Sequence, residues 1–255
     1  MSVTGVLLAA GGASRFRTSA EKSGLAAAHK LIAPLRGETV FYWSLRNLLE
    51  AIPQSAISEV VVIQGALDLS GLVELVVGTR NLTVRIVTNS DWEQGQATSL
   101  ALAIDTITFA RTSPQVAPLG DEGSSLRVPS TGRELHRQHR QHRQDGSAVP
   151  EVELPNRAEL REAMVVGLGD QPFIPPQTWA AVADAPVEQQ IVVATYGGLR
   201  RNPVRIAAGL WKEIPRTGDE GARPLLRKRA ELVHELPCNG DPADIDTVED
   251  LLRWS

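Results

Sequence analysis

Glycines at the end of the first apolar run could form a phosphate-binding loop. Residues 3–10 are apolar apart from Thr4 and lead directly into Gly11 and Gly12. Glycines at the carboxyl end of a buried strand allow backbone N–H groups to approach a phosphate closely. The chain contains neither the Walker pattern nor the three-glycine dinucleotide fingerprint. Two basic residues, Arg15 and Lys30, follow the glycines and could neutralise phosphate charge.

Carboxylates at two later points could bind a divalent cation. Asp170 ends the apolar run 163–169, and Pro172 fixes the turn that follows. Asp244 and Asp246 are two residues apart, so both could face one crevice from an extended segment. A carboxylate beside a triphosphate would repel it unless Mg²⁺ lies between them, and Mg²⁺ takes few protein carboxylates. A turn or helix-capping role is the alternative, and the choice between Asp244 and Asp246 stays open.

Apolar patterning predicts the elements that position these residues. Strands are expected at 3–10, 59–65, 82–88, 163–169 and 190–196, with an edge strand at 232–236. Helices are expected at 39–51, 69–77, 98–110, 177–183 and 247–254, with short helices around 204–213 and 222–230. The alternation predicts a Rossmann-like three-layer α/β/α fold with a mostly parallel sheet. If the first and fourth strands are neighbours, the glycines and Asp170 face the same crevice.

Residues 110–158 break this pattern. They include no aromatic residue, isoleucine or methionine, and five prolines. We expect a flexible low-complexity insertion within a single domain that spans residues 1–255. Its histidines His136, His139 and His142 could bind a metal, but low-complexity drift is the simpler interpretation.

Composition excludes several classes of protein. A net charge of −4 and an aromatic content of 4% argue against nucleic-acid binding over a broad surface. No apolar run approaches the roughly 18 residues of a membrane span. The first residues do not resemble a secretory signal, and the single cysteine, Cys238, fits a reducing compartment. A cytoplasmic protein without membrane or nucleic-acid partners is therefore expected.

The glycine and lysine segments resemble the signature of a known family. Leu8-Ala9-Ala10-Gly11-Gly12-Ala13-Ser14-Arg15-Phe16 and His29-Lys30-Leu31 are similar to the Leu-Ala-Ala-Gly-x-Ser-x-Arg-Met-Gly and Pro-Lys-Leu motifs of MobA-like NTP transferases. This group includes molybdenum cofactor cytidylyltransferases and molybdopterin guanylyltransferases. The resemblance implies a fold of the nucleotide-diphospho-sugar transferase type, with Arg15 and Lys30 at the triphosphate. An insertion at 18–28 makes Lys22 a competitor, although the residues after Lys30 match the family better.

Further segments extend the resemblance along the chain. Residues 89–100 resemble a family motif beside the base, and 195–204 and 218–223 resemble motifs that contact the second substrate. Helix capping is the alternative role for Ser99, and Asn202 stands where histidine is usual. The candidate nucleotide-binding residues are Leu8, Ala9, Ala10, Gly11, Gly12, Ala13, Ser14, Arg15, Lys30, Gln64, Asn89, Gly95 and Ser99. The candidate acceptor-binding residues are Gln171, Pro172, Arg200, Asn202 and Arg223.

The resemblance implies a Mg²⁺-dependent transfer of a nucleoside monophosphate to a phosphorylated acceptor. Arg15, Lys30 and Asp170 are the expected catalytic residues, and Asp170 with Asp246 or Asp244 is the expected metal site. Ala10 is typical of cytidylyl members, so CTP is favoured over GTP, and molybdopterin is the leading acceptor. One alternative is another acceptor, such as a phospholactate or a sugar or polyol phosphate. The other is a non-catalytic nucleotide- or cofactor-binding partner in the maturation of a molybdenum enzyme.

Overall fold

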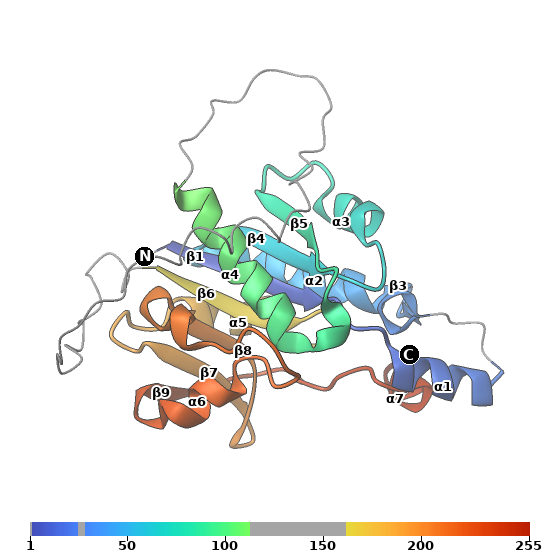
Figure 1. The fold of residues 1–255 in the computed structure, drawn as a ribbon. Helices are drawn as coiled ribbons and strands as arrows, with labels where there is room; N and C mark the ends of the chain where they lie inside the picture. Colours follow the sequence, from blue (N-terminus) through green and yellow to red (C-terminus); the bar gives the residue numbers. More distant parts are fainter. Residues whose placement is uncertain (1, 25–28, 113–161) are drawn as a thin grey trace, which may run out of the picture. The chain divides into compact units, whose positions relative to one another are not determined.

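A seven-stranded sheet forms the centre of the part of the chain that the computed structural model describes, residues 2–24, 29–112 and 162–255 (Figure 1). In their order across the sheet, the strands are β5 (Val84–Thr88), β4 (Ile57–Gln64), β1 (Ser2–Ala9), β6 (Glu162–Leu168), β8 (Leu199–Ala207), β7 (Ile191–Tyr196) and β9 (Val233–Pro237). Strand β8 is antiparallel to its two neighbours, and every other pairing in this sheet is parallel.

Strand β1 lies between β4 and β6, which confirms the predicted adjacency of the first and fourth strands. Leu8 pairs with Ile63 on one side and with Leu168 on the other. The three strands therefore end at one edge of the sheet. The glycines after β1 and Asp170 after β6 leave the sheet together at this edge.

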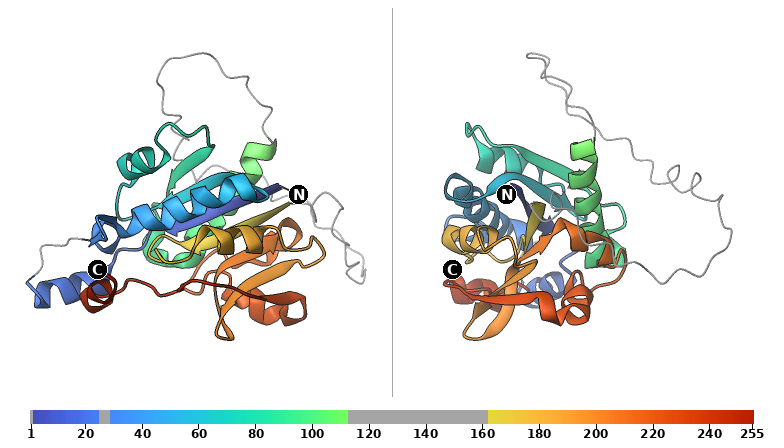
Figure 2. Two further views of the ribbon diagram at one scale, coloured as in Figure 1. Left: turned by 180° about the vertical axis from the view of Figure 1, so that it is seen from behind. Right: turned by 90° about the vertical axis from the view of Figure 1, so that its left-hand side faces the viewer.

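Helices cover both faces of the sheet, so the three-layer arrangement is confirmed (Figure 2). Alternate side chains of β1 face opposite sides, because successive residues of a strand point in opposite directions. Leu7 packs in one core with α2 (Val40–Ala51), α3 (Ser70–Val77) and α5 (Pro176–Ala183). Leu8 packs in the other core with α4 (Gln96–Thr112), the 3₁₀ helix η5 (Ala208–Glu213) and α6 (Arg223–Lys228).

A third, smaller core joins the first and last helices. It contains Phe16 and Ala20 of α1 (Ser14–Lys22) and Val248 and Leu251 of α7 (Val248–Trp254). A short hairpin of β2 (Pro34–Leu35) and β3 (Glu38–Thr39) contributes Leu35. Because Arg15 precedes Phe16 and Asp246 follows the buried Ile245, this core brings both charged residues to the same place.

Two segments differ from the sequence predictions. The helix expected around 204–213 is wrong in its first part, because Val204–Ala207 ends strand β8 and only Ala208–Glu213 is helical, as η5. Helix α1 was not expected, since an insertion was assigned to residues 18–28. The other predicted elements are confirmed, with ends shifted by no more than two residues.

Most of the expected insertion lies outside the described residues. Helix α4 continues through the first residues assigned to it and ends at Thr112. His136, His139 and His142 lie outside the described residues, so their predicted role stays a prediction. No helix in the described ranges is long and apolar enough to cross a membrane.

Candidate functional site

A crevice of about 330 Å³ opens where β1 and β6 end. One wall is the glycine loop and the other is formed by the start of α4 and the 3₁₀ helix η3 (Trp92–Gln94). The lining residues are Leu8, Ala9, Ala10, Gly11, Gly12, Lys30, Leu31, Trp92, Glu93, Gly95, Gln96, Ser99, Leu168, Asp170 and Asp219. Nine of these residues are candidates from the sequence, so the structure brings them together around one cavity. The other six were not expected, namely Leu31, Trp92, Glu93, Gln96, Leu168 and Asp219.

The glycine loop is packed closely on one side and open on the other. A Cβ atom added to Gly12 would lie 2.7 Å from the ring of Trp92, whereas a Cβ on Gly11 would meet nothing within 4 Å. Ala13 then adopts a left-handed conformation (φ 54°) and α1 begins at Ser14. The loop therefore leaves the strand and reverses into a helix within a few residues, with its exposed backbone at Gly11.

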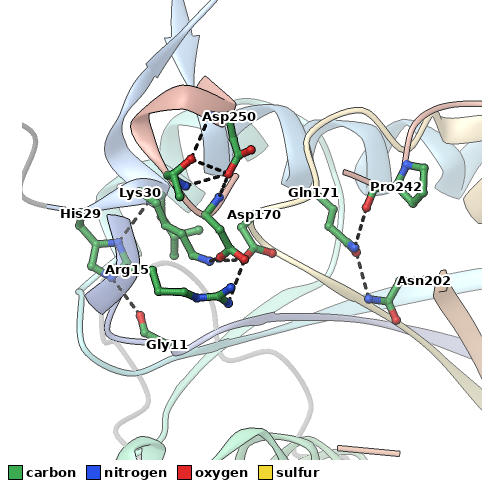
Figure 3. A network of polar contacts seen from close by, with 12 residues as sticks. Gly11, Arg15, His29, Lys30, Asp170, Gln171, Asn202, Pro242 and Asp250 are labelled. Carbon is green, nitrogen blue, oxygen red and sulfur yellow. Dashed lines mark hydrogen bonds and ion pairs between the residues drawn. The ribbon is translucent and has the colours of Figure 1, made fainter. Parts of the chain in front are cut away.

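Lys30 joins the two predicted metal-binding carboxylates (Figure 3). Its Nζ lies 2.5 Å from Oδ2 of Asp170 and 2.7 Å from Oδ1 of Asp246. The three side chains are 14–20% exposed. Burial disfavours the charge of Lys30, but the two carboxylates outweigh this effect and raise its pKa. Lys30 and Asp170 therefore line the crevice as an ion pair, and Asp246 pairs with Lys30 beside it.

Arg15 reaches the same cluster from outside. Its Nη2 lies 2.9 Å from Oδ2 of Asp246, and its side chain is 75% exposed. Lys22 lies in the last turn of α1 and lines a separate shallow hollow with Ser14, Arg15 and Thr18. The structure thus places Lys30, and not Lys22, beside the glycine loop.

The segment that carries Asp244 and Asp246 is tied to the end of β6. Ile245 between them is fully buried, and its backbone N–H donates to the carbonyl oxygen of Asp170 at 3.0 Å. Thr247 caps α7 in a capping box with Asp250. Asp246 faces Lys30, whereas Asp244 lines a neighbouring cavity, so the two aspartates do not share one crevice.

Asp244 has an unusual carboxyl group. Loss of hydration, together with the charges of Asp170 and Asp246, raises its pKa to about 6. The residue as a whole is nevertheless exposed to solvent. Three carboxylates therefore lie near enough to influence one another, with Lys30 between two of them.

The carboxylates fit a cation that is bound together with phosphates. Oδ1 of Asp170 is buried and has no hydrogen-bond partner among the described residues. Such an oxygen normally has a partner, so its orientation suits a ligand. The described ranges contain no group of three or more His, Cys, Asp or Glu side chains that could hold a metal alone. Mg²⁺, which takes one or two carboxylates plus phosphate oxygens, matches this donor set.

A second cavity of about 780 Å³ adjoins the first and shares Leu168 with it. Its apolar wall includes Val193, Val204 and Leu226. Four arginines also line it, namely Arg200, Arg201, Arg223 and Arg227. Arg200 pairs with Glu235 and Arg227 with Glu220. Arg201 and Arg223 have no acidic partner within the described part of the chain, so two guanidinium groups remain for an anionic ligand.

Gln171 and Asn202 line this cavity and are hydrogen-bonded to each other (Figure 3). The amide of Asn202 donates to Oε1 of Gln171 at 3.0 Å, and Gln171 donates to the carbonyl of Pro242 at 3.1 Å. The hydroxyl of Tyr196 donates to the carbonyl of Asn202. Both predicted acceptor residues are therefore held by neighbours on each side.

Several predicted site residues lie behind the cavities. The side chain of Gln64 is buried and bonds to the Leu69 backbone and to Thr88. Asn89 is buried and donates to the hydroxyls of Thr98 and Ser99. Pro172 is buried outside both cavities, and its carbonyl accepts from Asn47. These residues position the lining but do not face it.

Sequence reasoning missed other residues of the crevice. Asp219 belongs to a segment expected at the second substrate, yet it lines the first crevice with Glu93. The Gly218 backbone explains this placement, because it bonds to Gln94 and Ala97 beside α4. Arg223, five residues after Gly218, does line the second cavity. His29, next to Lys30, is buried and bonds to the glycine loop.

Comparison with known proteins places this site in context. A family model described as the MobA-like NTP transferase domain matches residues 5–233. No curated protein matches the chain. The residues matched by the family model include the glycine loop, Lys30, Asp170 and both arginines that lack an acidic partner.

Solved structures share the fold. A nucleotidyl transferase from Methanothermobacter thermautotrophicus is 21% identical, with a TM-score of 0.64 over 99% of this chain and 95% of that chain. Rv0371c from Mycobacterium tuberculosis is 22% identical, with a TM-score of 0.60 over 100% and 97%, and a structure of it with manganese is also known. An inositol-1-phosphate CTP transferase from T. maritima is 13% identical, with a TM-score of 0.56 over 97% and 90%. At these identities the similarity is one of fold.

Proposed function

We propose a specific reaction for this chain, which belongs to the MobA-like NTP transferase family and is a nucleotidyltransferase. In this reaction the protein transfers CMP from CTP to a phosphorylated small molecule and releases pyrophosphate. The proposal rests on the cluster in which Lys30 joins Asp170 and Asp246 beside the glycine loop. This cluster lies between a crevice that suits a nucleotide and a cavity that suits an anionic acceptor.

Backbone N–H groups, two cationic side chains and two carboxylates have different roles in binding the triphosphate. The backbone N–H groups of Gly11 and Gly12 approach the phosphates, and Lys30 and Arg15 neutralise their charge. Asp170 and Asp246 would hold Mg²⁺, which would act as a Lewis acid toward the charge that develops on the phosphates. Asp246 is preferred over Asp244 because only Asp246 shares Lys30 with Asp170.

The chemical step requires little beyond correct positions. An oxygen of the acceptor phosphate attacks the α-phosphorus of CTP, and the bond from the α-phosphorus to the bridging oxygen of pyrophosphate breaks. No general base is needed, because the acceptor phosphate is already an anion. Orientation and charge neutralisation are the main sources of rate enhancement in such a reaction.

The second cavity supports an acceptor with an anionic group and an apolar portion. Arg201 and Arg223 supply the cationic partners, and Val193, Val204 and Leu226 supply the apolar wall. Molybdopterin is our leading acceptor, on the resemblance of the sequence motifs. A polyol phosphate, a sugar phosphate and phospholactate are the competing acceptors, and a non-catalytic partner protein is the competing role.

CTP is the proposed nucleotide because Ala10 occupies the position that is typical of cytidylyl members. Ala10 lines the crevice and is 6% exposed. Its Cβ also lies against Gly65, where an added Cβ would approach to 2.8 Å. The position is therefore tightly packed, and its side chain shapes the crevice directly.

A ligand panel tests the nucleotide. Thermal unfolding is measured with CTP, GTP, ATP or UTP, each with Mg²⁺. A ligand at about 100 times its Kd stabilises the folded state by roughly 2.7 kcal/mol. The largest shift is expected with CTP, and equal or larger shifts with GTP would contradict the choice of base.

Pyrophosphate release tests the reaction and the acceptor. The assay contains the preferred nucleotide, Mg²⁺ and, in turn, molybdopterin, a polyol phosphate, a sugar phosphate and phospholactate. Release with one acceptor identifies the substrate class. Nucleotide binding without release for any acceptor would favour the non-catalytic role.

The single cysteine, Cys238, remains the basis for expecting a reducing, cytoplasmic location.

A further inference from the structure

His29 lies between the two elements that are proposed to bind the nucleotide phosphates. The residue is only 7% exposed. Its Nε2 lies 2.9 Å from the carbonyl oxygen of Gly11 in the glycine loop. Its Nδ1 lies 3.3 Å from the backbone nitrogen of Leu31, next to Lys30 (Figure 3). One imidazole ring thus contacts both the loop and the lysine segment.

The two contacts together fix the tautomer. The backbone N–H of Leu31 is a donor, so Nδ1 must accept and carries no proton. The proton of the neutral ring is therefore on Nε2, from which it is donated to the carbonyl of Gly11. Both nitrogens are used, and only the neutral ring can make both hydrogen bonds.

We propose that His29 is a positioning residue, whose neutral ring holds the glycine loop at a fixed distance from Lys30. This inference rests on the proposed function, because its effect on binding requires the loop and Lys30 to hold the same nucleotide. The ring does not line the crevice itself. It acts through Gly11 and Lys30.

This chain has a particular need for such a contact. Residues 18–28 lengthen the connection between Arg15 and Lys30, and a longer connection restrains its ends less. Gly11 has no side chain with which to contact the lysine segment. The signature that the sequence resembles has proline where this chain has His29, and a proline ring could make neither hydrogen bond. The histidine therefore supplies a restraint that the signature residue cannot.

The surroundings of the ring keep it neutral near pH 7. Burial lowers the pKa of His29 below 6.5, and the charges of Lys30 and Arg17 add to this effect. The Gly11 carbonyl and Asp170 oppose it, but the net change is downward. A depressed pKa means that the neutral contact is fully present above about pH 6.5 and is lost as the pH falls through the lower value in the folded protein. Protonation would turn Nδ1 into a donor that faces the Leu31 N–H.

Two conservative variants separate the two contacts. In His29→Asn, the side-chain oxygen lies near the position of Nδ1 and can accept from Leu31, but the amide does not reach Gly11. In His29→Gln, the amide nitrogen lies near the position of Nε2 and can donate to Gly11, while the contact with Leu31 is lost. Neither variant titrates near neutral pH.

The experiment compares the Kd for CTP with Mg²⁺ in the wild type and both variants. We expect His29→Asn to bind about tenfold more weakly, as for the loss of one hydrogen bond, and His29→Gln to stay within about threefold of the wild type. Below the lowered pKa of His29, the wild type keeps only the contact with Gly11, so its affinity should approach that of His29→Gln. Equal affinities in the two variants at neutral pH would overturn the proposal.

A measurement without nucleotide separates this inference from the proposed function. Backbone order parameters of Gly11 and Gly12 should decrease in His29→Asn and remain at the wild-type level in His29→Gln. If the wild type binds none of the four nucleotides, the proposed function fails, and the order parameters alone decide whether His29 restrains the loop. Unchanged order in His29→Asn would show that it does not.

Discussion

At the scale of single residues, Asp170 combines a paired oxygen with an oxygen that has no partner. Oδ2 lies 2.5 Å from Lys30, and Oδ1 is buried without a hydrogen-bond partner among the described residues. A structural aspartate normally uses both oxygens when it is buried. The arrangement is that of a group with a ligand still to bind.

Asp170→Asn should therefore abolish turnover while the fold is kept. The change is nearly isosteric, so packing at the end of β6 should survive. Loss of a ligand that positions the cation should reduce the rate about a hundredfold or more. Pyrophosphate release, measured beside the melting curve, tests this expectation.

Asp105→Asn is the matched control for this variant. Asp105 is a 55% exposed residue of α4 that pairs with Arg216 at the surface. Its removal should change neither rate nor melting temperature appreciably. Near-normal turnover in Asp170→Asn would remove the metal assignment, and a lower melting temperature without a loss of rate would indicate a structural role.

The two glycines of the loop should respond differently to alanine. Gly12→Ala places a Cβ 2.7 Å from the Trp92 ring, so the indole, which lines the crevice, must shift. Gly11→Ala meets nothing within 4 Å and serves as the control. We expect Gly12→Ala to weaken CTP binding about tenfold or more, equivalent to 1.4 kcal/mol, and Gly11→Ala to have a much smaller effect. Calorimetry checks both, and equal losses would show that Trp92 does not limit the loop.

Sequence reasoning found residues with a family signature or a distinct chemical type at a strand end. Lys30 and Asp170 were predicted in this way, and the structure brings them into contact. His29 and Asp219 were missed for a physical reason. The function of a buried histidine depends on the backbone groups that it contacts. For His29 one of these groups is the carbonyl of Gly11, which is 18 residues away in the sequence. Nothing in the local pattern specifies such a contact.

At the scale of elements, strand β8 depends on a buried arginine. Arg205 is 1% exposed, and its guanidinium bonds to the carbonyl oxygens of Ala183, Ala185, Pro186 and Gln189. These carbonyls belong to the end of α5 and the loop before β7. Burial lowers the pKa of Arg205 to about 10, so the side chain remains charged at neutral pH. One side chain thus donates to four backbone acceptors, of which the Pro186 carbonyl also accepts from the Gln189 N–H.

Arg205→Met should destabilise the protein strongly. Methionine fills much of the space but removes the guanidinium donor from the carbonyl groups of the buried residues Ala183 and Ala185, at a cost of about 1–3 kcal/mol each before relaxation and water entry. We expect the free energy of unfolding to fall by about 3 kcal/mol or more. Urea denaturation measures the change.

The control for this variant is Arg216→Met, which removes an arginine that is 62% exposed. Its effect should be below about 1 kcal/mol. Similar stabilities for the two variants would show that the carbonyls near Arg205 find other partners.

The same arginine explains why β8 was not predicted. An arginine between Val204 and Ile206 is compatible with an alternating strand only if it is exposed or has buried partners, and the sequence does not reveal the partners. The segment Arg200-Arg201-Asn202-Pro203 before it has no apolar alternation. Helix α1 was missed because only Phe16 and Ala20 in it are buried. The central parallel strands β1, β4 and β6 were predictable because each contains a run of apolar residues, and β5 was predictable from its alternation.

At the scale of the whole molecule, the described residues form two cavities along one end of the sheet, which we propose bind the two substrates. The nucleotide crevice lies beside β1 and β6, and the second cavity lies beside β6, β8 and β7. Leu168, the last residue of β6, lines both. The reacting groups would therefore meet at the end of a single strand, β6.

Deletion of residues 112–155, with a short flexible linker in their place, should leave folding and nucleotide binding nearly intact. The basis is the composition of the segment, which has no aromatic residue, isoleucine or methionine to contribute to a core. Loop length changes the closure free energy only slowly, so the shorter connection costs little. Cooperative urea unfolding and the CTP-induced thermal shift are the measurements. Loss of cooperativity would show that the segment contributes to the core.

The ion pairs of Lys30 also have a thermodynamic consequence. Without ligands, its ammonium group already balances much of the charge of Asp170 and Asp246. A free divalent ion must compete with this internal cation, whereas a triphosphate offers Lys30 another anionic partner and releases both carboxylates. Cation and nucleotide should therefore bind with positive cooperativity, and by linkage each raises the affinity for the other by the same factor. In a cell rich in free magnesium, such coupling would keep the site in its lysine-paired form until a nucleotide arrives.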